Sequence, residues 1–208
     1  TATELNLLDG KAATNLALVG KQAGTNFTGS LLVGHATTGT LSSANNNTGI
    51  GIQALDAITS ADSVTAVGYK AGTSITSGGQ NTAIGFEALE SCATHGSNTA
   101  VGYYALTTAV GSANTAVGRN ALLLNNSGAN NIAMGYNAGD NITSGDGNVI
   151  IGSINADSAT ADKQLIIADG VNGSVAWIKG DSSGNVSVPS NLNLSGSNKE
   201  LRFYEGAN

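Results

Sequence analysis

Hydrophobic and polar residues recur along the central part of this chain in units of about 17 residues. The clearest units begin at Asn81, Asn98 and Asn114 and read NTAIGFEAL, NTAVGYYAL and NTAVGRNAL. With the central glycine as a marker, the unit recurs at Gly34, Gly51, Gly68, Gly85, Gly102, Gly118, Gly135 and Gly152, at steps of 17, 17, 17, 17, 16, 17 and 17 residues. A weaker copy at 17–24 suits an irregular first coil. Repeats of this length indicate a solenoid.

The residues around each marker glycine form columns, and each column has one chemical character. The residue before the glycine is a large aliphatic in every unit: Val19, Val33, Ile50, Val67, Ile84, Val101, Val117, Met134 and Ile151. The residue two before the glycine points to the other face of a strand and is alanine in most units: Ala66, Ala83, Ala100, Ala116 and Ala133. We therefore expect a short strand whose aliphatic column faces the core and whose alanine face lets another backbone come close.

Polar columns predict how each coil turns. Asparagine stands four residues before the glycine in six of seven units, with Val64 as the exception. Asparagine tolerates left-handed backbone, and stacked asparagines can form an amide ladder. A threonine column begins at Thr48 and ends in Ile132 and Val149, and these replacements suggest that it faces inward. At about 4.8 Å per coil, eight coils make a rod about 35 to 40 Å long.

Three segments follow from this pattern. Residues 1–14 have capping-box spacing and predict a short cap or helical turn. The solenoid runs over 15–156, with a degenerate beginning. Residues 157–208 lose the repeat and predict a β-hairpin or meander, because an Asn172-Gly173 turn signal lies between two strand-like runs. Since one more strand-like run precedes Asn208, we expect the protein to continue toward a further C-terminal part.

Composition narrows the function classes. The chain of 208 residues has 11 % charged and 4 % aromatic residues, 29 glycines and one proline, whereas globular domains average about 25 % charged residues. This composition fits a thin structure held by backbone ladders rather than a compact enzyme. The net charge of −6 supplies no basic surface for nucleic acid, and no apolar run is long enough to cross a bilayer.

Two protein families share features with this sequence. The Asn-Thr-Ala-Ile/Val-Gly coils resemble the heads of trimeric autotransporter adhesins, in which a similar Asn-Ser-Val-Ala-Ile-Gly motif builds a parallel β-roll wound as a trimer. The coil here is longer, and its second half carries Ala-Leu or Ala-Gly. The opening TATELNLLDG at 1–10 and the closing GSNKELRFYE at 196–205 are similar to segments of bacteriophage tail fibres. The opening segment is the more specific, and the resemblance implies a tail fibre.

Oligomer formation is also expected from the columns themselves. A 17-residue coil encloses a thin core, and a face of alanine and glycine would be left exposed on a single chain. Burial of that face against two symmetric copies removes the exposure. The sequence therefore predicts a homotrimer wound from an all-β parallel β-roll or β-solenoid.

Few residues suggest catalysis or metal binding. Cys92 and His95 could form half of a zinc site, but Cys92 lies in a column of isoleucine and alanine, which predicts a buried small hydrophobe. His95 lies in a turn column, where trimer symmetry could bring three histidines to one metal. His35 lies in a mostly aromatic column, and we expect it to pack there. No Ser/His/Asp set is expected.

Other motifs have structural explanations too. The segment Gly49 to Ala54 matches a G-x-G-x-x-A dinucleotide pattern, but it is one unit of the repeat. Asp146 and Asp181 lie in glycine-containing turns, where calcium is conceivable and ordinary turn chemistry is the simpler interpretation. Glu87 and Glu90 are the only close acidic pair in the regular coils. A polysaccharide-cleaving enzyme would need two carboxylates about 5 to 9.5 Å apart. We expect no catalytic, cofactor-binding or metal residues and no enzyme activity.

These observations predict a structural shaft of a phage tail fibre, located in the virion and involved in host attachment. A bacterial surface adhesin head and a solenoid tailspike that degrades polysaccharide are the alternatives. Expected partners are two further copies, other virion proteins and a host cell surface glycan or protein, without membrane insertion. Receptor contact is expected beyond Asn208, with exposed turns such as that of Tyr104 and the region of Trp177 as secondary candidates.

Overall fold

The structure is a computed structural model that describes residues 22–24, 27–34 and 39–188. Side chains are described from residue 28 onward within these ranges. The expected cap at 1–14, the strand-like run near the C-terminus and the packing of His35 lie outside the described residues.

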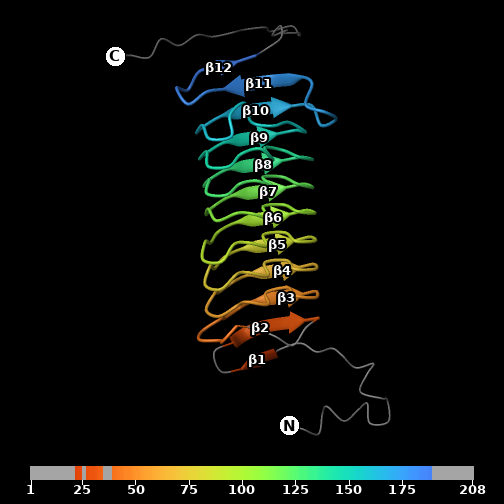
Figure 1. The fold of residues 1–208 in the computed structure, drawn as a ribbon, viewed down its shortest axis with the longest axis vertical. Coiled ribbons are helices and arrows are strands. Elements are labelled where there is room, and N and C mark those ends of the chain that lie inside the picture. Colours follow the sequence, from red (N-terminus) through yellow and green to blue (C-terminus); the bar gives the residue numbers. More distant parts are fainter. Residues whose placement is uncertain (1–21, 25–26, 35–38, 189–208) are drawn as a thin grey trace, which may run out of the picture.

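Twelve strands stack in chain order into one sheet, which forms one side of an elongated rod (Figure 1). The strands are β1 Gln22–Gly24, β2 Phe27–Val33, β3 Thr48–Ile50, β4 Thr65–Val67, β5 Thr82–Ile84, β6 Thr99–Val101, β7 Thr115–Val117, β8 Ile132–Met134, β9 Val149–Ile151, β10 Leu165–Ala168, β11 Ala176–Gly180 and β12 Val186–Ser187. From β2 to β10 every neighbouring pair is parallel, and equivalent residues of successive units lie side by side. The described residues contain no helix.

The predicted all-β solenoid is confirmed, with about eight turns of about 17 residues. Strand β1 pairs with β2 in the antiparallel direction, so the described part of the weak first copy does not form a parallel coil. At the other end, β10 pairs antiparallel with β11, and β11 with β12. Among the described residues, no helix is long and apolar enough to cross a membrane.

The two faces of the strands are the reverse of the sequence expectation. The alanines two before each glycine are fully buried inside the coil. Ile50, Ile84 and Met134, from the aliphatic column that was expected to face the core, are 44 %, 39 % and 46 % exposed. The threonine column, also expected inside, shares this outward face. Both expectations are wrong for one reason: the interior has room for alanine and not for a second layer of large side chains.

The opposite side of each coil supplies the large side chains of the core. Leucines four after the glycine, such as Leu89 and Leu106, are fully buried. A side chain added at Gly49, in the alanine column, would meet Leu32 Cδ2 and come within 3.4 Å of Leu55 Cδ1. The alanine face is therefore the floor on which these leucines pack. Leu32 and Ile150 occupy the same column at the two ends of the solenoid and are fully buried as well.

Two columns of the core compensate each other in volume. The position four after the marker glycine is occupied by leucine in four coils and by glycine in two. Its φ is 51 to 58°, a conformation that glycine adopts without strain. Where it is glycine, at Gly72 and Gly139, the position seven after the marker is a fully buried isoleucine. Where it is leucine, that position is smaller in three of four coils. The pairs are Leu55 with Ile58, Gly72 with Ile75, Leu89 with Cys92, Leu106 with Ala109, Leu122 with Asn125, and Gly139 with Ile142.

The asparagine column forms a ladder inside the rod, as expected, and Val64 interrupts it between Asn47 and Asn81. The side-chain oxygen of Asn98 accepts the backbone N–H of Asn114 at 2.9 Å, and Asn114 does the same for Asn131 at 3.0 Å. The amide nitrogen of Asn114 donates to the carbonyl of Gly128 at 2.9 Å. All six asparagines of the column are buried. Because buried polar groups are costly without partners, this column fixes the register between coils.

The turn conformation lies one residue earlier than expected. The left-handed residue precedes the ladder asparagine, as at Ser97 and Ala113, with φ of 62° and 58°. The marker glycines are also left-handed; Gly102, for example, has a φ of 143°. A side chain at Gly102 would collide with the carbonyl oxygen of Gly118 in the next coil. Glycine is needed there because the backbones of successive coils approach directly.

The volume compensation predicts a double-mutant rescue. Ile75→Ala alone should lower the free energy of unfolding by about 2 to 5 kcal/mol, and Gly72→Leu alone by about 1 to 3 kcal/mol, because a side chain at residue 72 would lie 2.8 Å from Ile75 Cδ1. The double variant recreates the Leu106 and Ala109 pair. In urea denaturation, its loss of unfolding free energy should therefore be well below the sum of the two single-variant losses.

The matched control combines Gly72→Leu with Ile142→Ala, which removes an equivalent isoleucine four coils away. These two costs should add, because the sites share no partner. If the adjacent pair is as additive as the distant pair, the volume compensation is wrong.

Candidate functional site

The outward face of the sheet is a continuous uncharged surface along the rod. Its two columns hold the aliphatic residues before the glycine and the threonines, and each column continues from β2 to β10 without a charged residue. Leu31 and Ile132, which replace threonine at the two ends, are also exposed. Soluble single chains rarely expose contiguous apolar surfaces of this kind, which commonly mark contacts with other molecules.

A ladder of planar side chains follows one edge of this face. The rings of Tyr69, Phe86 and Tyr103 stack with centroids 5.0 and 5.1 Å apart, close to the spacing between strands. Arg119 occupies the same column, with its guanidinium 5.6 Å from the Tyr103 centroid and 5.4 Å from that of Tyr136. A planar guanidinium stacks on aromatic faces, so arginine continues the ladder where an aromatic residue is missing.

The acidic pair that raised the enzyme alternative is part of an ion-pair cluster. Lys70 Nζ, from the preceding coil, lies 3.1 Å from Glu90 Oε1 and 3.8 Å from Glu87 Oε1. The hydrogen bond and the charge of Glu90 raise the pKa of Lys70. This arrangement gives the two carboxylates a structural role at the surface, where such pairs contribute little stability.

Tyr104 packs against the ladder edge-on. Its ring centroid lies 4.2 Å from that of Tyr103 and 5.6 Å from that of Phe86. The hydrogen bond with the Tyr103 side chain, followed by desolvation and the charge of Glu87, raises the pKa of Tyr104 to about 12. The exposed turn that was a secondary candidate for receptor contact is therefore packed against neighbouring rings.

Cys92 and His95 belong to the same turn of one coil. Cys92 is fully buried, which confirms the sequence expectation, and its Sγ donates to the carbonyl of His95 at 3.1 Å. Burial raises the pKa of the Cys92 thiol, which disfavours the reactive thiolate. His95 lies half-buried on its turn, and its carbonyl also accepts from the Asn81 amide.

The turn aspartates bind backbone groups of their own surroundings. Asp146 Oδ1 accepts the N–H of Ala129 at 2.7 Å, and the N–H of Asp146 donates to Asp162 Oδ1 at 2.8 Å. Asp181 is bonded by the side chain and N–H of Asn185 and by the N–H of Ser183, which lower its pKa. Within the described ranges, no group of three or more metal-ligating side chains converges.

The nucleotide-like motif is confirmed as one unit of the repeat. Gly49 lies in β3, in the buried alanine column, and the coil continues without a helix. A phosphate-binding loop of the dinucleotide type needs a helix N-terminus after the glycines. Trp177, the other secondary candidate for receptor contact, is 52 % exposed on β11.

Comparison of the chain with protein-family models, with curated proteins and with solved structures gives no match. Three surface features of the rod are candidates for function: an uncharged outward face, a stacked ladder along its edge, and irregular coils at the end near β9 and β10. Sequence reasoning missed the first of these because it assigned the aliphatic column to the core.

The environment of Tyr104 predicts its titration. The unfolded pKa of tyrosine is about 10 and the folded value about 12, so its contribution to stability is complete below about pH 10 and is lost as pH rises toward 12. An ultraviolet absorbance titration of the folded protein should show one late tyrosine among the five.

The variant Tyr104→Phe should remove this late step. Simultaneous ionisation of all tyrosines near pH 10 in the folded wild-type protein would contradict the packing described for Tyr104.

Proposed function

We propose that this chain is a structural shaft segment of a bacteriophage tail fibre and that it assembles as a homotrimer through the outward face of its sheet. The observation that carries the assembly is the uncharged face formed by the aliphatic and threonine columns, which runs over nine parallel strands, β2 to β10. At the strand spacing of about 4.8 Å, this face is about 38 Å long.

The physical basis for assembly differs from the sequence expectation. The alanine face needs no partner, because leucines of the same coil cover it. The exposed aliphatic side chains supply the driving force for assembly instead. When equivalent faces of other chains cover them, each Å² of apolar surface removed from water stabilises the assembly by about 25 cal/mol. Three chains around one axis place three equal faces together and keep all chains parallel, as in the families that the coil motif resembles.

The mechanical role follows from the bonding between coils. Each coil is tied to the next by parallel strand pairing, and in all but the coil of Val64 a buried asparagine adds to this bonding. Nearly every repeated feature of the column pattern serves packing or turning. Such a rod supplies reach and rigidity. Antiparallel strands at both described ends of the sheet limit further edge pairing. A position of the coding gene among virion structural genes would favour the tail fibre over the adhesin head.

The assembly is tested by mass in solution. Light scattering should give three times 20.5 kDa, or 61.5 kDa, for the wild-type chain. Ile84→Asp places a charge at the centre of the outward face and should yield a folded chain of 20.5 kDa, with its β circular-dichroism spectrum retained, because this side chain does not face the coil interior.

Leu124→Asp is the matched control. Leu124 is 50 % exposed but lies outside the strands, so the trimer mass should persist. A wild-type monomer, or a trimer that survives Ile84→Asp, would overturn the proposed interface. Loss of the fold in Ile84→Asp would support the original assignment of this column to the interior.

A further inference from the structure

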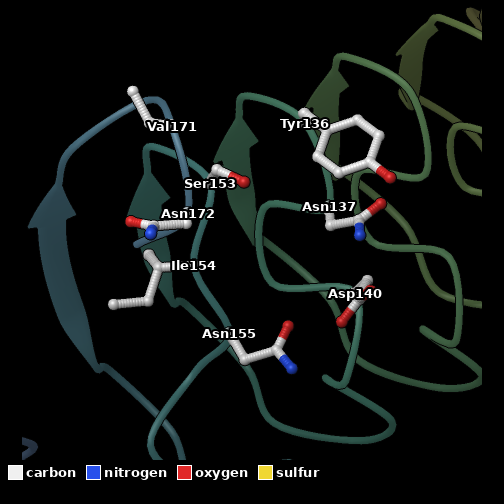
Figure 2. A pocket seen from close by; sticks show the side chains of 8 residues that line it. All are labelled: Tyr136, Asn137, Asp140, Ser153, Ile154, Asn155, Val171 and Asn172. Atoms are coloured by element: carbon white, nitrogen blue, oxygen red, sulfur yellow. The ribbon is translucent and has the colours of Figure 1, made fainter. Parts of the chain in front are cut away.

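A hollow of about 390 Å³ lies where the aromatic ladder ends (Figure 2). One side is formed by Tyr136, Asn137 and Asp140, which follow β8. The facing side is formed by Ser153 and Asn155, which follow β9, and Asn172 of the loop between β10 and β11 closes it. All of these residues lie in loops, so the hollow is separate from the outward face of the sheet.

Two departures from the repeat create this hollow. Ser153 stands in the ladder column, one residue after Gly152, where the preceding coil has Tyr136. The small serine leaves the ring of Tyr136 without an aromatic neighbour on this side, whereas Arg119 lies against the ring from the preceding coil. Asn155 stands in the column that holds buried alanine in the regular coils. An apolar, closed position is thereby replaced by an amide at the surface.

Two other rings of the ladder lack this open face. Phe86 is stacked between Tyr69 and Tyr103. Tyr103 in turn lies between Phe86 and Arg119. A flat ligand therefore finds no uncovered ring face at these two positions. Tyr136 is different because its coil is followed by serine, and it is 48 % exposed.

Two polar groups of the hollow point toward one another. Figure 2 shows the carboxylate of Asp140 and the amide of Asn155 converging from the two sides. Desolvation raises the pKa of Asp140, and the hydrogen bond from Asn155 acts in the opposite direction. The carboxylate supplies only acceptors, whereas the amide of Asn155 offers donors and an acceptor. The side-chain oxygen of Asn172 accepts the N–H of Ser174 at 3.1 Å within the closing loop. The hollow thus combines an aromatic surface with several separate hydrogen-bonding groups.

The backbone holds both sides of the hollow in place. The N–H of Gly139 donates to the carbonyl of Ile154 at 2.8 Å, and the N–H of Ser153 donates to that of Asp169 at 2.9 Å. Asp169 Oδ1 accepts the N–H of Gly173 at 2.6 Å, beside Asn172 in the closing loop. A pre-formed site loses less entropy when a ligand binds.

The chemistry of these groups selects one class of ligand. The lining includes one carboxylate and no cation, which disfavours phosphates and acidic sugars. A divalent metal ion would need more carboxylates than Asp140 alone. A neutral sugar ring fits: its C–H face packs on an aromatic ring, and its hydroxyls both donate to a carboxylate and exchange hydrogen bonds with amides.

We propose that this hollow binds one neutral hexopyranose unit, with Tyr136 as the apolar platform and Asp140 and Asn155 as hydroxyl partners. The site is distinct from the turn of Tyr104 and from Trp177. The volume lies within the range of small-ligand sites, about 300 to 1,000 Å³. Binding is independent of the trimer proposed above, because each chain carries the complete site.

The test titrates the full 208-residue chain with the methyl glycosides of glucose, galactose, mannose and N-acetylglucosamine. Proton–nitrogen NMR spectra should show saturable shifts of the Asn155 side-chain amide for at least one sugar, with a Kd on the order of 1 to 10 mM, the range expected of a single small contact. Asp140→Ala and Tyr136→Ala should each weaken this binding by about tenfold or more, which corresponds to about 1.4 kcal/mol.

Phe86→Ala is the matched control, since it removes a ring that is covered on both faces, and its binding should equal that of the wild-type chain. The proposal is overturned if none of the four sugars gives saturable shifts up to about 50 mM, if both Asp140→Ala and Tyr136→Ala bind as the wild-type chain does, or if Phe86→Ala weakens binding equally. The oligomeric mass, measured on the same samples, decides the trimer proposal separately.

Discussion

The limited space inside each coil determines most of this structure. The sheet and the opposite side of the coil are close enough that only one layer of large side chains fits between them. Alanine on the inner face of the strands and leucine or isoleucine on the opposite side fill this layer together. A second aliphatic layer would overpack the core, which costs about 1 to 3 kcal/mol per site. The aliphatic residues of the strands therefore lie outside.

This constraint connects the fold to its surfaces. Because the large side chains of the strands cannot enter the coil, they form a continuous apolar face along the rod, and such a face favours association with equal faces. The buried asparagine ladder fixes how one coil sits on the next. Columns on the surface are therefore as regular as those inside, and the stacked rings of Tyr69, Phe86 and Tyr103 are the visible result.

The sequence predicted the period, the strands and the asparagine ladder, because these depend on residue spacing. It did not predict which face of the strand is inside. The alternation of side chains with period two is the same whichever face of the strand is inside. The prediction placed Ile84 inside because it is more hydrophobic than Ala83, without regard to the small size that alanine needs there. The volume compensation between Gly72 and Ile75 could have corrected the choice, since both residues must share one interior with the strand.

The hollow beside Tyr136 was missed for another reason. Its signal is a departure from the columns: serine at 153 in a ladder of planar side chains, and asparagine at 155 in a column of alanine. Residues that follow the column pattern are explained by packing. Residues that depart from it, such as Ser153 and Asn155, need another explanation. Its three-dimensional form also needs the loop that carries Asn172, whose position cannot be derived from the repeat.

Distances between chains test the central claim that equal outward faces meet in a parallel rod. Spin labels at Ser91→Cys or Leu124→Cys, each in a Cys92→Ala background, occupy the same column two coils apart on the exposed side opposite the sheet. Pulsed electron paramagnetic resonance should give one well-defined interchain distance that is the same for both positions, because parallel chains keep equal height. Different interchain distances at the two positions, or no dipolar signal at all, would contradict the parallel assembly through the outward face.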